Sequence, residues 1–226
     1  MEPNNHNKGK KAAAEKATEW VKDGMIVGLG TGSTAYYAIQ RLGTMVNEGL
    51  RIKAVASSLV SEQLARELEI HLIPLSQIDH IDLTIDGADE VDEAHNLIKG
   101  GGGALLREKI LAYHSKELII VVEEKKLVHT LGRFPLPVEV VPFAADLTVK
   151  HLADLGGTAA LRQQDDTLYR TDNGNYIADC RFGEIPDPAS LDIIIRTIPG
   201  VVETGLFLHH MVSRVVVGYE DGSVKY

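Results

Sequence analysis

Between residues 10 and 123, apolar residues with helical spacing alternate with short β-rich runs. The helical pattern predicts helices over residues 10–22, from the GTGST turn to about residue 45, and over 62–68 and 103–114. The β-rich runs predict strands over residues 25–28, 51–57, 71–74, 82–86 and 117–123. Strands and helices that alternate in this way favour a parallel, Rossmann-like α/β sheet covered by helices.

The pattern changes near residue 133. The segment RFPLPVEVVPF carries three prolines, which interrupt helices and central strands. Beyond it we expect a small α+β insert, with helices over 144–155 and 188–198, a strand over 158–162, and a hairpin of 168–171 and 176–181 around residues 172–175. The strands near 202–208 and 213–219 are expected to return to the first sheet. The predicted domains are therefore residues 1–133 plus 203–226, and residues 134–202.

Composition limits the classes of protein to consider. The 226 residues are 44% hydrophobic and 24% charged, as in globular proteins, and no apolar run is long enough for a membrane span. The net charge of −9 argues against a nucleic-acid partner and requires a local positive field for any anionic ligand. The polar N-terminus is not expected to be a secretory signal, and the single Cys180 suits a reducing cytoplasm.

The first loop that has the composition of a ligand-binding site is GLGTGST, residues 28–34. Its glycines allow backbone N–H groups to approach a ligand closely, and Thr31, Ser33 and Thr34 add hydroxyl groups at the start of a helix. The motif has neither the ending of a P-loop nor full dinucleotide-binding spacing, and its hydroxyl-rich ending suits one phosphate or hydroxyl group better than a pyrophosphate. A tight strand–helix turn with Ser33 as the N-cap remains an alternative.

The second loop is DGADE, residues 86–90, which follows a predicted strand. Small residues flank its carboxylates, so a ligand could approach closely. The alternative is a structural turn in which Asp86 binds backbone N–H groups while Asp89 and Glu90 face solvent. No further carboxylate or histidine has metal-ligand spacing to it.

The third loop is KGGGGALLREK, residues 99–109. Four consecutive glycines between a strand-like Leu97-Ile98 and a helix favour a backbone that folds around a ligand. Glu108 lies early in that helix, where its side chain can lean toward the loop. On spacing alone, an exposed glutamate between Arg107 and Lys109 is the better interpretation.

Three other features are weaker candidates for functional sites. His209-His210 lacks zinc-ligand partners, Cys180 fits a core position, and Asp172-Asn173-Gly174 is typical of a turn.

Together, GLGTGSTA, Ser57-Ser58, DGADE and KGGGGALLREK resemble the ribose-5-phosphate isomerase A family. The resemblance extends through FPLPVEV, TDNGN and IPGVVETGLF, and so covers nearly the whole chain. It implies a Rossmann-like domain with a smaller α+β, ferredoxin-like domain, and a homodimer or homotetramer that needs no metal or organic cofactor. It also implies interconversion of ribose 5-phosphate and ribulose 5-phosphate, in the pentose phosphate pathway, by an aldose–ketose isomerase.

The same resemblance suggests roles for individual residues. Glu108 would move a proton between C1 and C2 through an enediolate, and Asp86 would help ring opening and proton movement between oxygens. Asp89 and Lys99 would hold sugar hydroxyls and the developing oxyanion. The remaining substrate contacts implied are Thr31, Gly32, Ser33, Thr34, Gly87, Ala88, Gly100, Gly101, Gly102, Lys126 and, at the phosphate end, Lys10.

Two other functions remain open on the residues alone. A catalytically silent phosphosugar sensor would carry a helix-turn-helix and a basic face, and the acidic chain shows neither. A nucleotide-binding protein would carry an acidic residue about 20 positions past its glycine-rich turn, which is missing here.

Overall fold

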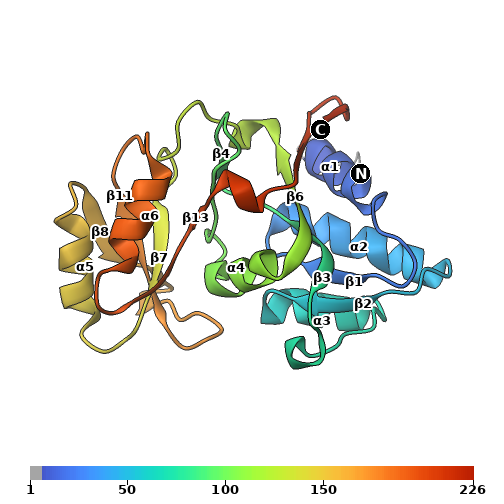
Figure 1. Cartoon of the computed structure of the whole chain (residues 1–226), viewed down its shortest axis with the longest axis horizontal. Coiled ribbons are helices and arrows are strands. Elements are labelled where there is room, and N and C mark those ends of the chain that lie inside the picture. The colour runs from blue at the N-terminus through green and yellow to red at the C-terminus, as the bar shows by residue number, and fades with distance from the viewer. Residues whose placement is uncertain (1–6) are drawn as a thin grey trace. The chain divides into compact units, whose positions relative to one another are not determined.

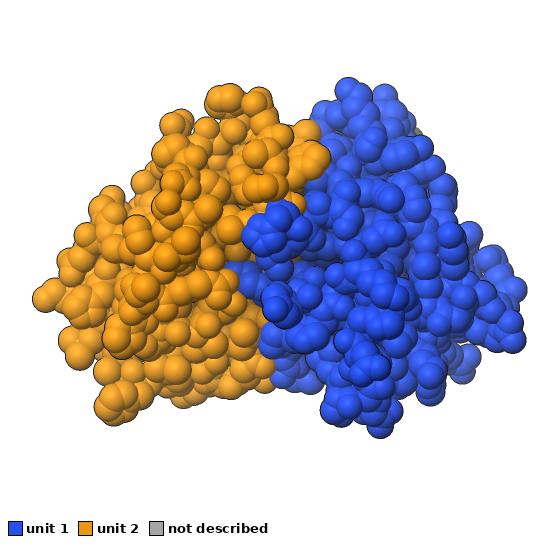
Figure 2. Space-filling model, in the orientation of Figure 1, with its two compact units in different colours: residues 1–88, 107–126, 210–226 blue, residues 89–106, 127–209 orange. Residues whose placement is uncertain are grey.

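The computed structural model describes residues 7–226. The chain divides into two compact units, coloured separately in Figure 2. The first unit extends to Ala88 and also contains Arg107–Lys126 and His210–Tyr226, whereas the second contains Asp89–Leu106 and Leu127–His209. The division into a Rossmann-like domain of residues 1–133 plus 203–226 and a small α+β domain of residues 134–202 stays a prediction.

The first unit is built on a six-stranded, mostly parallel sheet (Figure 1). Its parallel strands pair through β-rich, buried runs, and only the last strand is antiparallel. The Rossmann-like prediction for this part of the chain is therefore confirmed. The strands, in spatial order, are β15 (Val224–Lys225), β14 (Arg214–Gly218), β6 (Ser115–Glu123), β3 (Ile81–Asp86), β1 (Ile26–Leu29) and β2 (Lys53–Ala56).

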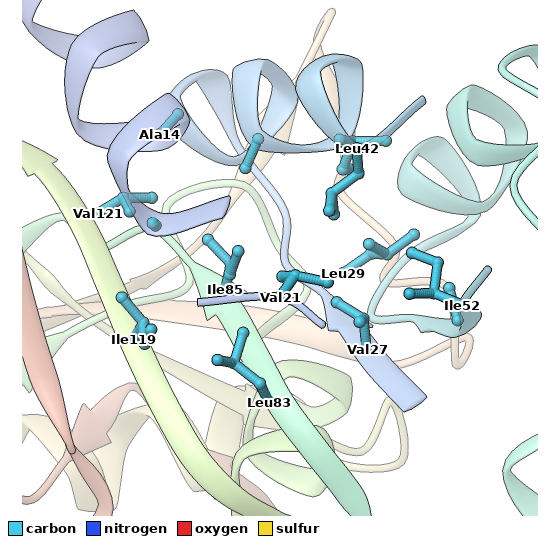
Figure 3. Packing of buried hydrophobic residues seen from close by; sticks show 14 of the residues in the cluster. Ala14, Val21, Val27, Leu29, Leu42, Ile52, Leu83, Ile85, Ile119 and Val121 are labelled. Carbon is cyan, nitrogen blue, oxygen red and sulfur yellow. The ribbon is translucent and has the colours of Figure 1, made fainter. Parts of the chain in front are cut away.

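Helices cover both faces of this sheet. Ala54 and Val55 are neighbours in β2 but belong to different apolar clusters, because successive strand residues point to opposite faces. The larger cluster, shown in Figure 3, joins the sheet to α1 (Lys8–Thr18), α2 (Ser33–Asn47) and α3 (Leu59–Glu67). The smaller one includes Leu111 of α4 (Leu105–Tyr113).

The second unit contains a four-stranded antiparallel sheet with two helices. In chain order its elements are β7 (Leu136–Val140), α5 (Ala145–Ala153), β8 (Thr158–Leu161), β11 (Tyr176–Arg181), α6 (Pro188–Arg196) and β12 (Val201–Thr204). The sheet order is β12-β7-β11-β8. This βαββαβ order is that of the ferredoxin-like fold, as predicted. Its core includes Val138, Ala178, Leu152 and Ile195.

Short elements complete the fold. A three-stranded sheet joins β4 (Glu90–Val91), β5 (Leu97–Ile98) and β13 (Leu206–Phe207), and a hairpin joins β9 (Gln163–Gln164) and β10 (Thr167–Leu168). Single 3₁₀ turns lie at η2 (Leu75–Gln77), η3 (Glu124–Lys126) and η4 (His209–Met211). No helix within residues 7–226 is long and apolar enough to cross a bilayer.

Pro137 lies in β7, a central strand, although the prolines of this segment predicted otherwise. Its carbonyl accepts from the N–H of Gly205, which follows the last residue of β12. Since the N–H and C=O of one residue in an antiparallel strand point to the same side, the missing donor faces the side where β12 has ended. The proline therefore removes no hydrogen bond to β11.

Three of the predicted strands or strand pairings are wrong. Residues 71–74 form only an isolated bridge between Leu72 and Ala54. Residues 168–171 do not pair with β11, because β10 closes its own hairpin with β9 and β11 pairs with β7 and β8. The segment 202–208 does not return to the first sheet, since β12 pairs with β7 and β13 with β5.

Candidate active site

In the first unit, Asp86 holds the loop that follows β1. Its carboxylate is buried, at 1% exposure, and Oδ1 accepts hydrogen bonds from the N–H groups of Thr31 (3.0 Å) and Gly87 (2.7 Å). Gly30 must be a glycine, because a Cβ there would lie 2.5 Å from the Cα of Asp86. The backbone contacts expected of a structural Asp86 are thus present, at the carboxyl end of β3 where open α/β sheets bind ligands.

A cluster of hydroxyl groups fixes the side chain of Thr31. Its Oγ1 lies 2.7 Å from Ser57 Oγ, 2.8 Å from Ser58 Oγ and 3.3 Å from Ser61 Oγ. Ser58 is also the N-cap of α3 and accepts from the Ser61 N–H, and the Ser61 hydroxyl donates to the Gly30 carbonyl at 2.7 Å. Ser61 escaped the sequence analysis, although its position three residues past an N-cap serine was the available signal.

The start of α2 is electropositive. Its N-cap is Gly32, with φ of +108°, so the prediction of Ser33 as the N-cap is wrong and Ser33 is the first helical residue. The first turn has no acidic residue, and the Lys10 ammonium donates to Ser33 Oγ at 3.1 Å. A helix N-terminus beside a lysine is the local positive field that an anionic ligand of this acidic chain requires. Thr34, in the same turn, is nearly buried, at 9% exposure.

The packing of α1 on β14 places Lys10. A Cβ on Gly9 would lie 2.8 Å from the Gly218 carbonyl oxygen, so the helix and the strand meet at a pair of glycines. Lys10 Nζ also lies 3.6 Å from the Glu123 carboxylate at the end of β6. Lys126 follows in η3, half-buried, three residues beyond that strand end.

Glu108 is buried, at 4% exposure, in the first turn of α4. The exposed glutamate that spacing favoured is therefore wrong. Burying a carboxylate costs free energy unless hydrogen bonds or charges compensate it, so its burial in the helix that follows the glycine loop makes Glu108 a candidate functional residue.

In the second unit, Asp89 and the glycine loop form one structure. The N–H of Gly101 donates to Asp89 Oδ2 at 2.7 Å, and a Cβ on Gly101 would lie 2.6 Å from Oδ1. Gly100 and Gly103 have φ of +103° and +83°, which only glycine adopts readily, and the Gly103 N–H closes a turn on the Gly100 carbonyl at 3.0 Å. The need for four glycines predicted from sequence has a conformational cause at these two positions.

Lys99, directly before these glycines, is buried at 2% exposure. Its ammonium lies 5.4 Å from the centroid of the Phe207 ring, and its N–H donates to the Gly205 carbonyl. Lys99 thus directly follows β5, and its buried ammonium lies near an aromatic ring of β13.

Glu90 holds the backbone of a distant segment, residues 132–134, in place. It is buried at 1% exposure, and its two carboxylate oxygens accept from the N–H groups of Gly132 (2.8 Å) and Phe134 (2.7 Å). The expectation that it faces solvent is wrong, and the spacing of DGADE gave no signal of this contact across more than 40 residues.

The structure distributes the predicted residues between the two units. The first unit holds Lys10, Thr31, Gly32, Ser33, Thr34, Asp86, Gly87, Ala88, Glu108 and Lys126, and the second holds Asp89, Lys99, Gly100, Gly101 and Gly102. Their roles stay predictions. Among residues 7–226, no group of three or more His, Cys, Asp or Glu side chains is arranged to hold a metal ion.

The Asp172–Asn175 turn does more than reverse the chain. Thr171 and Asn175 donate to Oε1 of the fully buried Glu139, at 3.0 and 2.8 Å. The turn therefore fixes a carboxylate of β7 inside the sheet.

Comparison with known proteins gives one family over most of the chain. Residues 53–222 match the family ribose 5-phosphate isomerase A (phosphoriboisomerase A). The chain is 51% identical to ribose-5-phosphate isomerase A of Bacillus mycoides over 218 residues, which cover 96% of this chain and 98% of that protein. The structure of ribose 5-phosphate isomerase A from Methanocaldococcus jannaschii superposes with a TM-score of 0.91 at 42% identity, covering 98% of both chains.

A second solved structure, of a D-ribose-5-phosphate isomerase in complex with phospho-erythronic acid, has a TM-score of 0.93 at 41% identity and covers 99% of this chain and 98% of that one. With a family model matched over residues 53–222 and relatives about half identical over 96% of its length, the chain belongs to the ribose 5-phosphate isomerase A family.

Proposed function

We propose that this protein interconverts D-ribose 5-phosphate and D-ribulose 5-phosphate through an enediolate, with Glu108 as the base. The observation that carries the proposal is the burial of Glu108, at 4% exposure, in the helix that directly follows the glycine loop. Family membership and relatives of the same printed name over 96% of the chain support the substrate. The reaction moves hydrogen within one molecule, so we propose that it needs neither a metal nor an organic cofactor.

The proposed chemistry balances without a further reactant. Glu108 takes the proton from C2 of the open-chain aldose, the C2 electrons form a C1–C2 double bond, and the C1 carbonyl becomes an oxyanion. Asp86 moves the hydroxyl proton from O2 to O1, the C2 carbonyl forms, and Glu108 returns its proton to C1. A general base of this kind contributes about 10²–10⁴-fold in rate.

The remaining residues are proposed to bind and stabilise. Lys99 and the backbone N–H groups of the glycine loop, Gly100 to Gly102, stabilise the enediolate oxygen, and Asp89 holds sugar hydroxyls. Lys10, Lys126 and the N-terminus of α2, residues Thr31 to Thr34, bind the phosphate end, which the electropositive start of α2 supports. Gly87 and Ala88 leave room for the sugar beside Asp86. The relative that carries phospho-erythronic acid supports a phosphorylated sugar acid as a probe of the same site.

The test is the variant Glu108→Gln. We expect its kcat to fall at least about 10³-fold while the Kd for ribose 5-phosphate, measured by calorimetry, stays within about threefold. Glu67→Gln, an exposed glutamate in α3, is the matched control and should keep wild-type turnover. Near-normal turnover of Glu108→Gln would remove Glu108 from the mechanism.

We also propose that the protein works as a homodimer or homotetramer in the cytoplasm. Exposed apolar side chains on the second unit, Phe143 (88%), Leu147 (62%) and Ile193 (65%), support self-association. The one cysteine, buried at 1% exposure, supports a reducing compartment. Light scattering on the purified protein tests the assembly, and a monomer at micromolar concentration would contradict it.

A further inference from the structure

Arg162, which follows a strand of the four-stranded sheet in the second unit, donates hydrogen bonds to the glycine loop. Its Nη1 donates to the carbonyl oxygens of both Gly100 and Gly101, at 3.0 Å each. These are residues of the predicted substrate cradle, whereas Arg162 follows β8, about 60 residues later in the chain. One guanidinium thus fixes two successive peptide groups of the loop.

Asp179 of β11 fixes the other edge of the guanidinium. Its two carboxylate oxygens accept from Arg162 Nε (2.9 Å) and Nη2 (2.6 Å), a bidentate pair. The arginine side chain is 15% exposed and the aspartate 30%, so solvent screens the pair only in part. Because Asp179 lies in the middle of the sheet, bonded through β11 to β7 and β8, its position is rigid. Arg162 therefore fixes the position of the glycine loop relative to the four-stranded sheet.

Tyr169 contacts the next residue of the glycine loop, Gly102. Its hydroxyl donates to the Gly102 carbonyl at 3.4 Å, and its ring lies 5.7 Å from the Arg162 guanidinium carbon. The Tyr169 N–H donates to the Arg162 carbonyl at 2.9 Å, so the two residues close the β9–β10 hairpin. Gly103 has no room for a Cβ, which would lie 2.1 Å from the Tyr169 hydroxyl.

Donors along one side of the loop determine where its N–H groups point. In a trans peptide the C=O of one residue and the N–H of the next point in opposite directions. Holding the carbonyls of Gly100 and Gly101 toward Arg162 therefore turns the N–H groups of Gly101 and Gly102 away from it. The first of these already donates to Asp89 at 2.7 Å, as this geometry requires.

We propose that Arg162, anchored by Asp179, is a positioning residue for the isomerase reaction: it orients the glycine-loop N–H groups and the Asp89 carboxylate toward the substrate. The proposal rests on the proposed function, because it assigns Arg162 a role at that same site. Arg162 does not touch the reacting atoms. Its effect on the rate comes through the loop, where a displacement of about 1 Å can cost about 10²-fold.

The test compares Arg162→Met with Arg170→Met. Arg170 lies close by in the chain but is exposed, and within residues 7–226 its side chain donates to the Gly174 carbonyl and the Tyr176 hydroxyl and to no atom of the glycine loop. We expect Arg162→Met to lose about 10- to 100-fold in kcat and a similar factor in affinity for phospho-erythronic acid, with KM for ribose 5-phosphate within about threefold. Arg170→Met should stay within about twofold of the wild type in all three.

Two more variants distinguish positioning from a general need for charge or for folding. Arg162→Lys keeps the charge but cannot join Asp179 to two carbonyls, so we expect it to remain at least about fivefold below the wild-type kcat. Asp179→Asn should also lower kcat while the thermal midpoint, followed by circular dichroism, shows a folded protein. If Arg162→Met does not fold, these two variants decide the question.

Three results would overturn the proposal: kcat of the Arg162 variants within about twofold of the wild type, full rescue by lysine, or a rise in KM alone. The proposed function fails separately, because an inactive wild-type protein would contradict it, whereas an active wild type with fully active Arg162 variants would contradict only the role of Arg162.

Discussion

The two glycine-rich loops of this protein are held in different ways. The loop after β1 is fixed from its own sheet, by Asp86 at the end of the adjacent strand β3 and by a cluster of hydroxyl groups around Thr31. The loop after Lys99 is fixed by side chains from both directions, Asp89 on an N–H group and Arg162 on two carbonyls. The first loop is thus part of a sheet edge, whereas the second is positioned by side chains from separate segments.

This difference teaches where a glycine matters for stability and where it matters for chemistry. A side chain added to the first loop meets both the carboxylate and the backbone of Asp86, since a Cβ on Gly30 would lie 2.4 Å from its Cγ and 2.5 Å from its Cα. A side chain added to the second meets the end of a side chain, since a Cβ on Gly101 would lie 2.6 Å from Asp89 Oδ1. The same substitution should therefore have opposite consequences in the two loops.

The largest expected effects come from this pair of substitutions. Gly30→Ala has to part β1 and β3, and we expect it to cost about 3 kcal/mol or more in unfolding free energy, with loss of activity. Gly101→Ala displaces only the Asp89 carboxylate, and we expect about a 10²-fold loss in kcat/KM with less than about 1 kcal/mol of destabilisation.

Urea denaturation and steady-state kinetics on both variants check this contrast, with the exposed Glu67→Gln in α3 as a control that touches neither loop. Equal destabilisation by Gly30→Ala and Gly101→Ala would show that the loops are held alike.

An intermediate effect separates two neighbouring acids. We expect Glu90→Gln to lose about 1–3 kcal/mol of stability, because its amide NH₂ would face one of the two N–H groups that the carboxylate accepts. Its kcat/KM should stay within about twofold of the wild type. Asp89→Asn should do the reverse, with about a tenfold or larger loss in kcat/KM and little change in stability. A kinetic defect in Glu90→Gln equal to that of Asp89→Asn would contradict this division.

The smallest expected effect concerns Cys180. Burial raises the pKa of its thiol to about 12, so hardly any thiolate forms at neutral pH. We expect the native protein to react with a disulfide reagent at pH 8 at less than about a hundredth of the rate of the protein in urea, without loss of activity. Rapid labelling of the native protein would show that the core of the second unit opens.

The alternation of β-rich runs and helical patterns in the first 123 residues was enough to predict the parallel sheet, and the apolar run of β6, residues 118–122, marks its buried centre. It was not enough for the second unit. The partner of β11 is β7, about 40 residues earlier, and no local signal marks such a pairing. The prediction that prolines interrupt the central strands failed at Pro137 for a related reason. Whether a proline breaks a strand depends on which neighbouring strand its missing N–H would have faced.

The candidate site divides in the same way. Glycine-rich and acidic loops at strand ends could be found by composition and spacing, and the resemblance supplied the roles. Burial could not be read from spacing: Glu108 resembled an exposed helix residue and Glu90 a solvated one, yet both are buried. Arg162 could not be found either, because it has no motif and reaches the loop only through the fold of the second unit.

The proton relay by Glu108 can be measured directly by following hydrogen exchange at carbon. With ribose 5-phosphate in D₂O, the wild-type protein should exchange hydrogen at C2 of the aldose for deuterium during equilibration, detected by proton NMR, and Glu108→Gln should leave C2 protonated while still binding the sugar. Equal deuterium incorporation by the two proteins, or turnover of the wild type with no label at any carbon, would contradict a glutamate that relays the proton through an enediolate.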